Sequence, residues 1–110
     1  NLKNLWSLDI EKQTHLSFLP RNLPESIKML SLRDNPKMKS SLKYLPLNLD
    51  YLYIKDCRNL LIIPDLHYLK KLRFLSATYD YDIRKKVKID HRIKNIPNLN
   101  IDIMIGYTRF

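Results

Sequence analysis

The sequence predicts a single-domain α/β solenoid in which short repeats each contribute one β-strand to a parallel sheet. Apolar residues recur at offsets 0, 3, 5 and 11 from anchors at residues 5, 27, 49, 72 and 96, so that successive units are 22 to 24 residues long. Even spacing of this kind is typical of arrays whose units bury their apolar edges against each other. The twenty positions are Leu5, Leu8, Ile10, Leu16; Ile27, Leu30, Leu32, Met38; Leu49, Leu52, Ile54, Leu60; Leu72, Leu75, Ala77, Ile83; and Ile96, Leu99, Ile101, Tyr107.

The centre of each unit alternates with period two, as a short strand with one buried face does. We therefore expect strands around Leu8–Ile10, Leu30–Leu32, Leu52–Ile54 and Leu75–Ala77, and a last strand within Leu99–Ile105, which alternates strictly. Because the units are nearly equal in length, these strands can stack side by side in parallel. Each unit then needs a return segment that leads back to the start of the next strand.

Prolines in the second half of the units indicate what the return segments look like. Proline lacks a backbone N–H and restricts the residue before it to extended conformations, so it excludes a regular helix at these places. We expect return segments that are mainly extended or 3₁₀, with at most short helices. The dipeptides concerned are Leu19-Pro20, Leu23-Pro24, Leu45-Pro46 and Ile63-Pro64.

A small polar residue or cysteine dominates the position at offset 8, which holds Gln13, Asn35, Cys57, Asp80 and Met104. An asparagine amide at the turn after a strand can bond backbone groups that would otherwise be buried unpaired, and cysteine is a small alternative. Here the stretches LWSLDIEKQ, IKMLSLRDN and LDYLYIKDC resemble the leucine-rich-repeat family, whose units read LxxLxLxxN/C. The leucine-proline segments are similar to the LPxxL segments of its short-repeat members. Asp80 and Met104 depart from this pattern.

The resemblance covers essentially the whole chain and implies a right-handed arc with a concave parallel sheet and an irregular or 3₁₀ convex side. We interpret residues 1–110 as one leucine-rich-repeat domain of about five units, which forms part of a longer array.

Composition limits the classes of function and location. The formal net charge is +9, which favours acidic partners. Gly106 is the single glycine, which excludes glycine-rich phosphate loops, and Cys57 is the single cysteine, which excludes an internal disulfide. No run approaches the roughly 18 to 20 apolar residues of a membrane span. We expect an intracellular, cytoplasmic protein, or one in a host cell or virion if the source is a pathogen.

The residues between the buried positions of each strand should point to the concave face. Met29, Tyr51 and Phe74 then align across three strands at a spacing of about 4.8 Å, with Tyr53 beside them. An aromatic and methionine centre with a charged rim is typical of a protein-binding hot spot. The alternative is that these side chains only stabilise the strands or are covered by another part of the parent protein. The predicted partner-binding residues are Met29, Tyr51, Tyr53 and Phe74, with Arg33 and Lys55 on the rim.

A basic run is the second candidate site, because clustered cations can meet nucleic acid phosphates or an acidic membrane surface. Val87, Ile89 and Ile93 interleave with the charges, so a solvated convex face is the alternative interpretation. No base-stacking aromatic residue lies within the run. The run comprises Arg84, Lys85, Lys86, Lys88, Arg92 and Lys94.

Catalytic chemistry is not indicated, and we expect neither an enzyme, nor a cofactor, nor a metal site. His15, His67 and His91 show no metal-ligand spacing, and Cys57 lies at the structural polar position rather than beside a base. The three repeat-spaced carboxylates Asp34, Asp56 and Asp80 could form a cation-binding column, although solvated acids are the commoner case.

A protein-protein interaction module is the function that the sequence favours. The alternatives are a structural component of a larger assembly, which would self-associate through open solenoid ends, and a nucleic-acid binder that uses residues 84–94. The family resemblance implies that such modules serve as immune receptors, as substrate-selecting parts of ubiquitin ligases, or as effectors delivered by pathogens.

Overall fold

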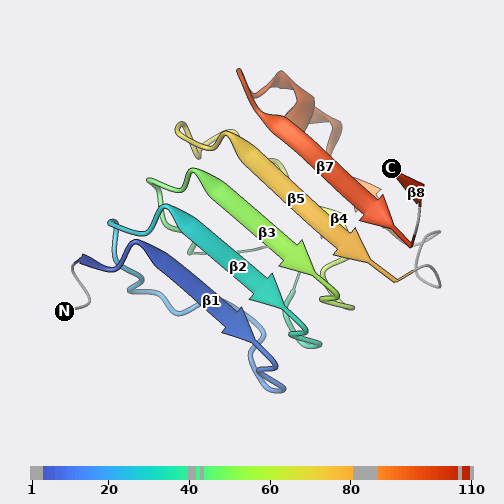
Figure 1. The fold of residues 1–110 in the computed structure, drawn as a ribbon, viewed down its shortest axis with the longest axis horizontal. Coiled ribbons are helices and arrows are strands. Elements are labelled where there is room, and N and C mark those ends of the chain that lie inside the picture. Colours follow the sequence, from blue (N-terminus) through green and yellow to red (C-terminus); the bar gives the residue numbers. More distant parts are fainter. Residues whose placement is uncertain (1–3, 40–41, 43, 81–86, 107, 110) are drawn as a thin grey trace.

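The computed structural model describes residues 4–39, 42, 44–80, 87–106 and 108–109. One sheet has the strand order β1-β2-β3-β5-β7-β8, in which every pairing up to β7 is parallel and only β8 is antiparallel to its neighbour. In Figure 1 the strands lie side by side in chain order and the return segments lie behind them. The predicted stack of parallel strands is therefore confirmed. The strands are β1 (Ser7–Glu11), β2 (Met29–Arg33), β3 (Tyr51–Lys55), β5 (Phe74–Tyr79), β7 (Asn100–Ile105) and β8 (Thr108–Arg109).

The first four units follow the predicted register. Leu30 is the partner of Leu8 and of Leu52, and Leu52 is the partner of Leu75, so each inward row continues through the stack. The fifth unit differs, because Asn100 lies opposite Phe74, where the prediction placed Asn98. A shift of two residues leaves the same side chains on the same face of a strand, so the alternating apolar pattern could not separate the two registers.

The core lies between the sheet and the return segments. Leu30, Leu32, Leu52 and Ile54 are fully buried. At the ends of the stack burial falls: Leu8 is half-buried, and Ile101 of β7 remains 36% exposed although it occupies an inward row. This gradient is expected of a one-dimensional stack, because an end unit has a neighbour on one side only.

The return side is irregular. Two short strands, β4 (Ile62–Ile63) and β6 (Lys88–Ile89), pair in parallel there, and a 3₁₀ helix, η3 (His91–Asn95), precedes β7. No α-helix occurs among the described residues. The chain is therefore a parallel-strand β-solenoid, and the α/β part of the prediction is not supported. Tight turns lead into β2 and β3: Ile27 N–H donates to Pro24 O and Leu49 N–H to Pro46 O, both at 3.3 Å.

The turn after each of the first three strands repeats one conformation. Lys12, Asp34 and Asp56 have φ between 53° and 56°, and the N–H of each donates to the next strand at 2.9–3.0 Å. The polar position that follows this turn residue contacts backbone groups in two of the units. The Asn35 amide donates to Ile10 O at 2.8 Å and accepts from Gln13 N–H at 3.0 Å, while the Cys57 thiol lies 3.6 Å from Leu32 O.

In the fourth unit a different residue bonds a buried backbone group near the end of the strand. Asp80, which the sequence places at the polar position, is exposed, whereas Tyr79 is buried. The Tyr79 hydroxyl donates to Leu60 O at 2.6 Å and so pairs a backbone carbonyl inside the solenoid. Burial raises the pKa of both the Tyr79 hydroxyl and the Cys57 thiol, as expected for groups whose charged forms are desolvated.

Among the residues for which the structure gives positions, no helix has the length and apolar character needed to cross a bilayer.

Candidate binding face

The side of the main sheet that faces away from the return segments, here called the open face, carries the aromatic residues that the sequence analysis selected. Met29, Tyr51 and Phe74 are consecutive partners in the ladder, which confirms their predicted alignment. The Tyr51 and Phe74 rings lie 5.9 Å apart between centroids, tilted by 33°. Tyr53 lies two residues further along β3, between Ser31 and Ser76. The parallel register thus joins residues from three units into one apolar row.

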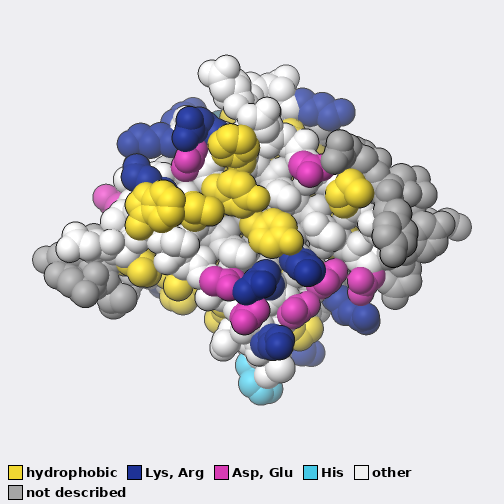
Figure 2. Space-filling model, viewed as in Figure 1, with side chains coloured by type: hydrophobic (Ala, Val, Ile, Leu, Met, Phe, Trp, Pro, Cys, Tyr) yellow, Lys and Arg dark blue, Asp and Glu magenta, His cyan; other side chains and the backbone are white. Residues whose placement is uncertain are grey.

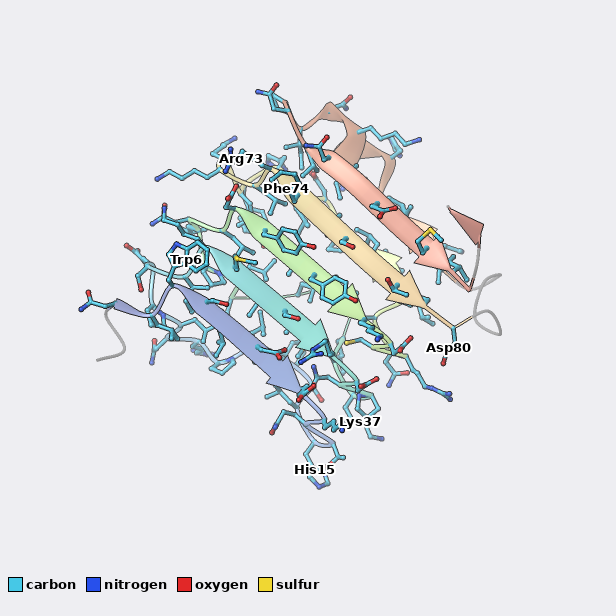
Figure 3. The ribbon with its side chains drawn as sticks, viewed as in Figure 1. Trp6, His15, Lys37, Arg73, Phe74 and Asp80 are labelled. Atoms are coloured by element: carbon cyan, nitrogen blue, oxygen red, sulfur yellow. The ribbon has the colours of Figure 1, made fainter. Side chains whose placement is uncertain are left out.

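Trp6 belongs to this surface and was missed by the sequence analysis. Its side chain is 54% exposed, and its backbone carbonyl accepts from Lys28 N–H at 2.8 Å and from Met29 N–H at 3.2 Å, so it stands at the start of the row (Figure 3). The corresponding positions of the next units carry Lys28, Asp50 and Arg73. The sequence did contain a signal for Trp6, because an apolar indole stands there at a position that is charged in the next three units. The aromatic band is defined here as Trp6, Met29, Tyr51, Tyr53 and Phe74.

The surface of the aromatic band is hollowed as well as apolar. Two hollows of about 220 Å³ lie on either side of Tyr51, one bounded by Met29 and Tyr53 and the other by Phe74 and Asn100. The small side chains Ser31 and Ser76, which lie on either side of Tyr53 in the ladder, help to line these hollows. Figure 2 shows the band as a patch of apolar side chains across the middle of this face. Such hollows can accept protruding side chains of a partner.

The predicted rim residue Arg33 is engaged within the protein. Its guanidinium binds both carboxylate oxygens of Asp9, with Nε 3.3 Å from Oδ1, and lies 3.1 Å from Glu11. The hydrogen bond from Arg33 lowers the pKa of Asp9. Lys55 is exposed beside Arg33 at the end of β3. The rim where the strands end is therefore a mixture of positive and negative groups, and Arg33 is paired within the protein.

The opposite rim, where the strands begin, contains a second cross-strand ion pair. Arg73 binds Asp50 through two hydrogen bonds of 2.6 and 3.0 Å, which lowers the pKa of Asp50. The Arg73 guanidinium also lies 5.8 Å from the centroid of the Phe74 ring. This contact connects the charged rim to the aromatic band.

The predicted basic run is only partly described, since Arg84, Lys85 and Lys86 lie outside the described residues. Lys88 and Lys94 are exposed on the return side. Arg92 is paired with Asp90 at 2.7 Å and lies 3.8 Å from Asp65. Hydrogen bonds from Arg92 lower the pKa of Asp90 to about 2. Asp90 caps η3 by accepting from Arg92 N–H at 3.0 Å, and its carboxylate also balances the charge of the Arg92 side chain.

Side chains that could bind a metal ion are not clustered in the parts of the chain that the structure describes. No group of three or more histidine, cysteine, aspartate or glutamate side chains there could hold a metal ion. Of the repeat-spaced carboxylates, Asp56 has a raised pKa, because of burial first and of the nearby charges of Asp80 and Asp34 next.

Neither a protein-family model, nor a curated protein, nor a solved structure matches this chain. The fold and the surface define its class: a parallel-strand β-solenoid whose open sheet face carries an exposed aromatic band.

Proposed function

We propose that this chain is a protein-protein interaction module that binds its partner on the aromatic band. The observation that carries the proposal is the exposure of large apolar side chains in one row across β2, β3 and β5, with Trp6 just before β1 at its end. Trp6 is 54% and Phe74 41% exposed. Contiguous apolar patches on folded proteins commonly mark interaction sites, and aromatic residues and methionine are enriched in the centres of such sites.

Cross-strand packing alone accounts poorly for the band. Tyr51 and Phe74 do contact each other, which stabilises neighbouring strands by a few tenths to about 1 kcal/mol. That contribution does not require Trp6, which lies at the outer end of the row, or the two hollows beside Tyr51. A partner that covers the band would bury the area that the strands leave exposed.

We also propose that the chain is a leucine-rich-repeat protein. The in-register parallel strands, the Asn35 and Cys57 bonds to backbone at one repeated turn, and the helix-poor return side support this assignment. The assignment implies protein recognition as the commonest use of the fold and adds to the argument from the band.

The test is capture from the native source by the wild-type chain beside a band variant, Trp6→Ala/Tyr51→Ala/Phe74→Ala. We expect a captured protein to bind the band variant at least tenfold more weakly, because aromatic hot-spot residues contribute about 2 kcal/mol or more each. The matched control is Phe18→Ala/Tyr44→Ala/Tyr68→Ala, which removes three return-segment rings that are 37–41% exposed. Circular dichroism and urea unfolding establish that both variants fold. Equal binding by the band variant and the wild type would refute the proposal.

Assembly into a larger particle is the second candidate, favoured by an apolar hollow at the last parallel strand. This hollow, of about 730 Å³, is bounded by Val87, Ile93, Ile101 and Ile103, and Ile101 is exposed there. The same capture experiment distinguishes the two functions. An assembly component would retain the same bound neighbours, or further copies of itself, in the band variant.

A further inference from the structure

A cationic hollow lies where the strands begin, next to the aromatic band. It has a volume of about 470 Å³ and is lined by residues of four successive units. Four of its side chains are cations and one is a carboxylate, so the lining residues carry a net charge of three positive units. These residues are Lys28, Lys70, Lys71, Arg73 and Asp50, with Asn48 beside them.

The one carboxylate of the hollow is already engaged. Asp50 accepts two hydrogen bonds from Arg73 and also lies in the field of Lys28, and both lower its pKa. Lys28, Lys70 and Lys71 are exposed and leave an excess of positive charge in the hollow. The opposite edge of the face differs, because Arg33 is balanced by Asp9 and Glu11, and Arg58 lies 3.7 Å from Asp80. Figure 2 shows this asymmetry as mainly blue side chains, with some magenta, at the upper left edge and closely mixed blue and magenta at the lower edge.

The hollow and the band are continuous. Arg73 lies over the Phe74 ring, and Lys28 directly precedes Met29 and donates its N–H to the Trp6 carbonyl (Figure 3). A ligand that rests on the band therefore meets the cationic hollow at the edge where the strands begin.

We propose that the partner of the band presents an acidic peptide segment, in which Asp or Glu side chains occupy the cationic hollow while a neighbouring apolar side chain lies on the band. The proposal rests on the proposed function and specifies the chemistry of the partner. Charge complementarity supports an acidic occupant, since charged groups that face each other across an interface are arranged with opposite signs.

Charge distribution favours a peptide over a nucleic acid. A nucleic acid carries phosphates along its whole length, and a strand that crossed the open face would meet mixed charges at the far edge, where Asp9 and Glu11 balance Arg33. A peptide can confine its carboxylates to one end and place neutral or basic residues at the other.

The experiment is selection of a random displayed peptide library on the folded chain, followed by affinity measurements with the best synthetic peptide. The hollow variant is Lys28→Gln/Lys70→Gln/Lys71→Gln, and the matched control is Lys37→Gln/Lys39→Gln/Lys94→Gln, which removes the same charge from exposed lysines elsewhere. We expect peptides with Asp or Glu beside an apolar residue. The hollow variant should bind the best peptide about tenfold more weakly, because it loses three exposed ion pairs, each of which strengthens binding by roughly twofold. The control should bind it as the wild type does.

A second comparison ties the effect to the carboxylates. Replacing Asp and Glu of the peptide with Asn and Gln should weaken binding to the wild type by the same factor and should have little effect on the hollow variant. Selected peptides that are apolar without acidic enrichment would overturn the acidic segment and leave the proposed function standing. Failure to select any peptide that needs the band would count against both. Steeply salt-dependent binding of oligothymidylate to the hollow, with no acidic peptide selected, would overturn the proposal in favour of a nucleic acid.

Discussion

Replacing Tyr79 with alanine is expected to lower the free energy of unfolding by about 4 kcal/mol, within the range for deletion of a buried aromatic ring. Tyr79 is 1% exposed and fills the core beneath β5, and its hydroxyl pairs the carbonyl of Leu60. Alanine removes the ring and leaves that carbonyl without its partner. Urea unfolding followed by circular dichroism measures the loss.

The Tyr79→Phe variant separates the two contributions. It keeps the ring and removes the hydroxyl alone, so we expect a loss of about 1–2 kcal/mol. If Tyr79→Ala cost less than about 1 kcal/mol, the ring would not be in the core.

Asn35→Ala is expected to lower the free energy of unfolding by about 2 kcal/mol, which is the second of the two largest effects. Asn35 is fully buried, and its amide joins the turn after β2 to that after β1 through Ile10 O and Gln13 N–H. The variant leaves one acceptor and one donor without these bonds, each worth about 1–3 kcal/mol if fully buried. We expect a total loss near the lower end of this range, because Gln13 is exposed and water can reach its N–H. Urea unfolding again provides the measurement.

Asn48→Ala is the matched control for this prediction. Asn48 also donates an amide hydrogen bond to a backbone carbonyl of the preceding unit, Glu25 O at 3.1 Å, but this bond is exposed. We expect a cost below about 0.5 kcal/mol for a surface position of this kind. Equal losses for Asn35→Ala and Asn48→Ala would contradict a structural role for the buried polar position.

Much of the fold could be predicted because repeat spacing and period-two alternation both constrain it. Together they gave the rows that contain Leu30 and Leu52 and, on the other face, Met29 and Tyr51. They could not give the last register, since a shift of two residues preserves alternation. The pairing of β4 with β6 was also beyond prediction, because two short segments on the return side carry no periodic signal.

The candidate site was predictable in its centre and less so at its edges. Tyr51, Tyr53 and Phe74 follow directly from the register. Trp6 was missed because only alternate positions within the strands were considered, and it lies just before β1. The ion pairs of Arg33 with Asp9 and Glu11 depend on side-chain rotamers, which the strand register alone does not determine. The cationic hollow combines residues from strand starts and return segments, whose proximity depends on the three-dimensional path of the chain.

Nuclear Overhauser spectroscopy on the free chain tests the central claim, that parallel in-register stacking aligns side chains of successive units into the aromatic band. Assigned spectra should contain cross-peaks between the ring protons of Tyr51 and Phe74, whose centroids are 5.9 Å apart, and between the Tyr51 ring and the Met29 methyl group. Cross-strand backbone cross-peaks between β3 and β5 should match the register in which Tyr51 faces Phe74. A folded chain whose Tyr51 and Phe74 rings show no mutual cross-peak, or whose β3 pairs with a strand other than β2 or β5, would contradict the account.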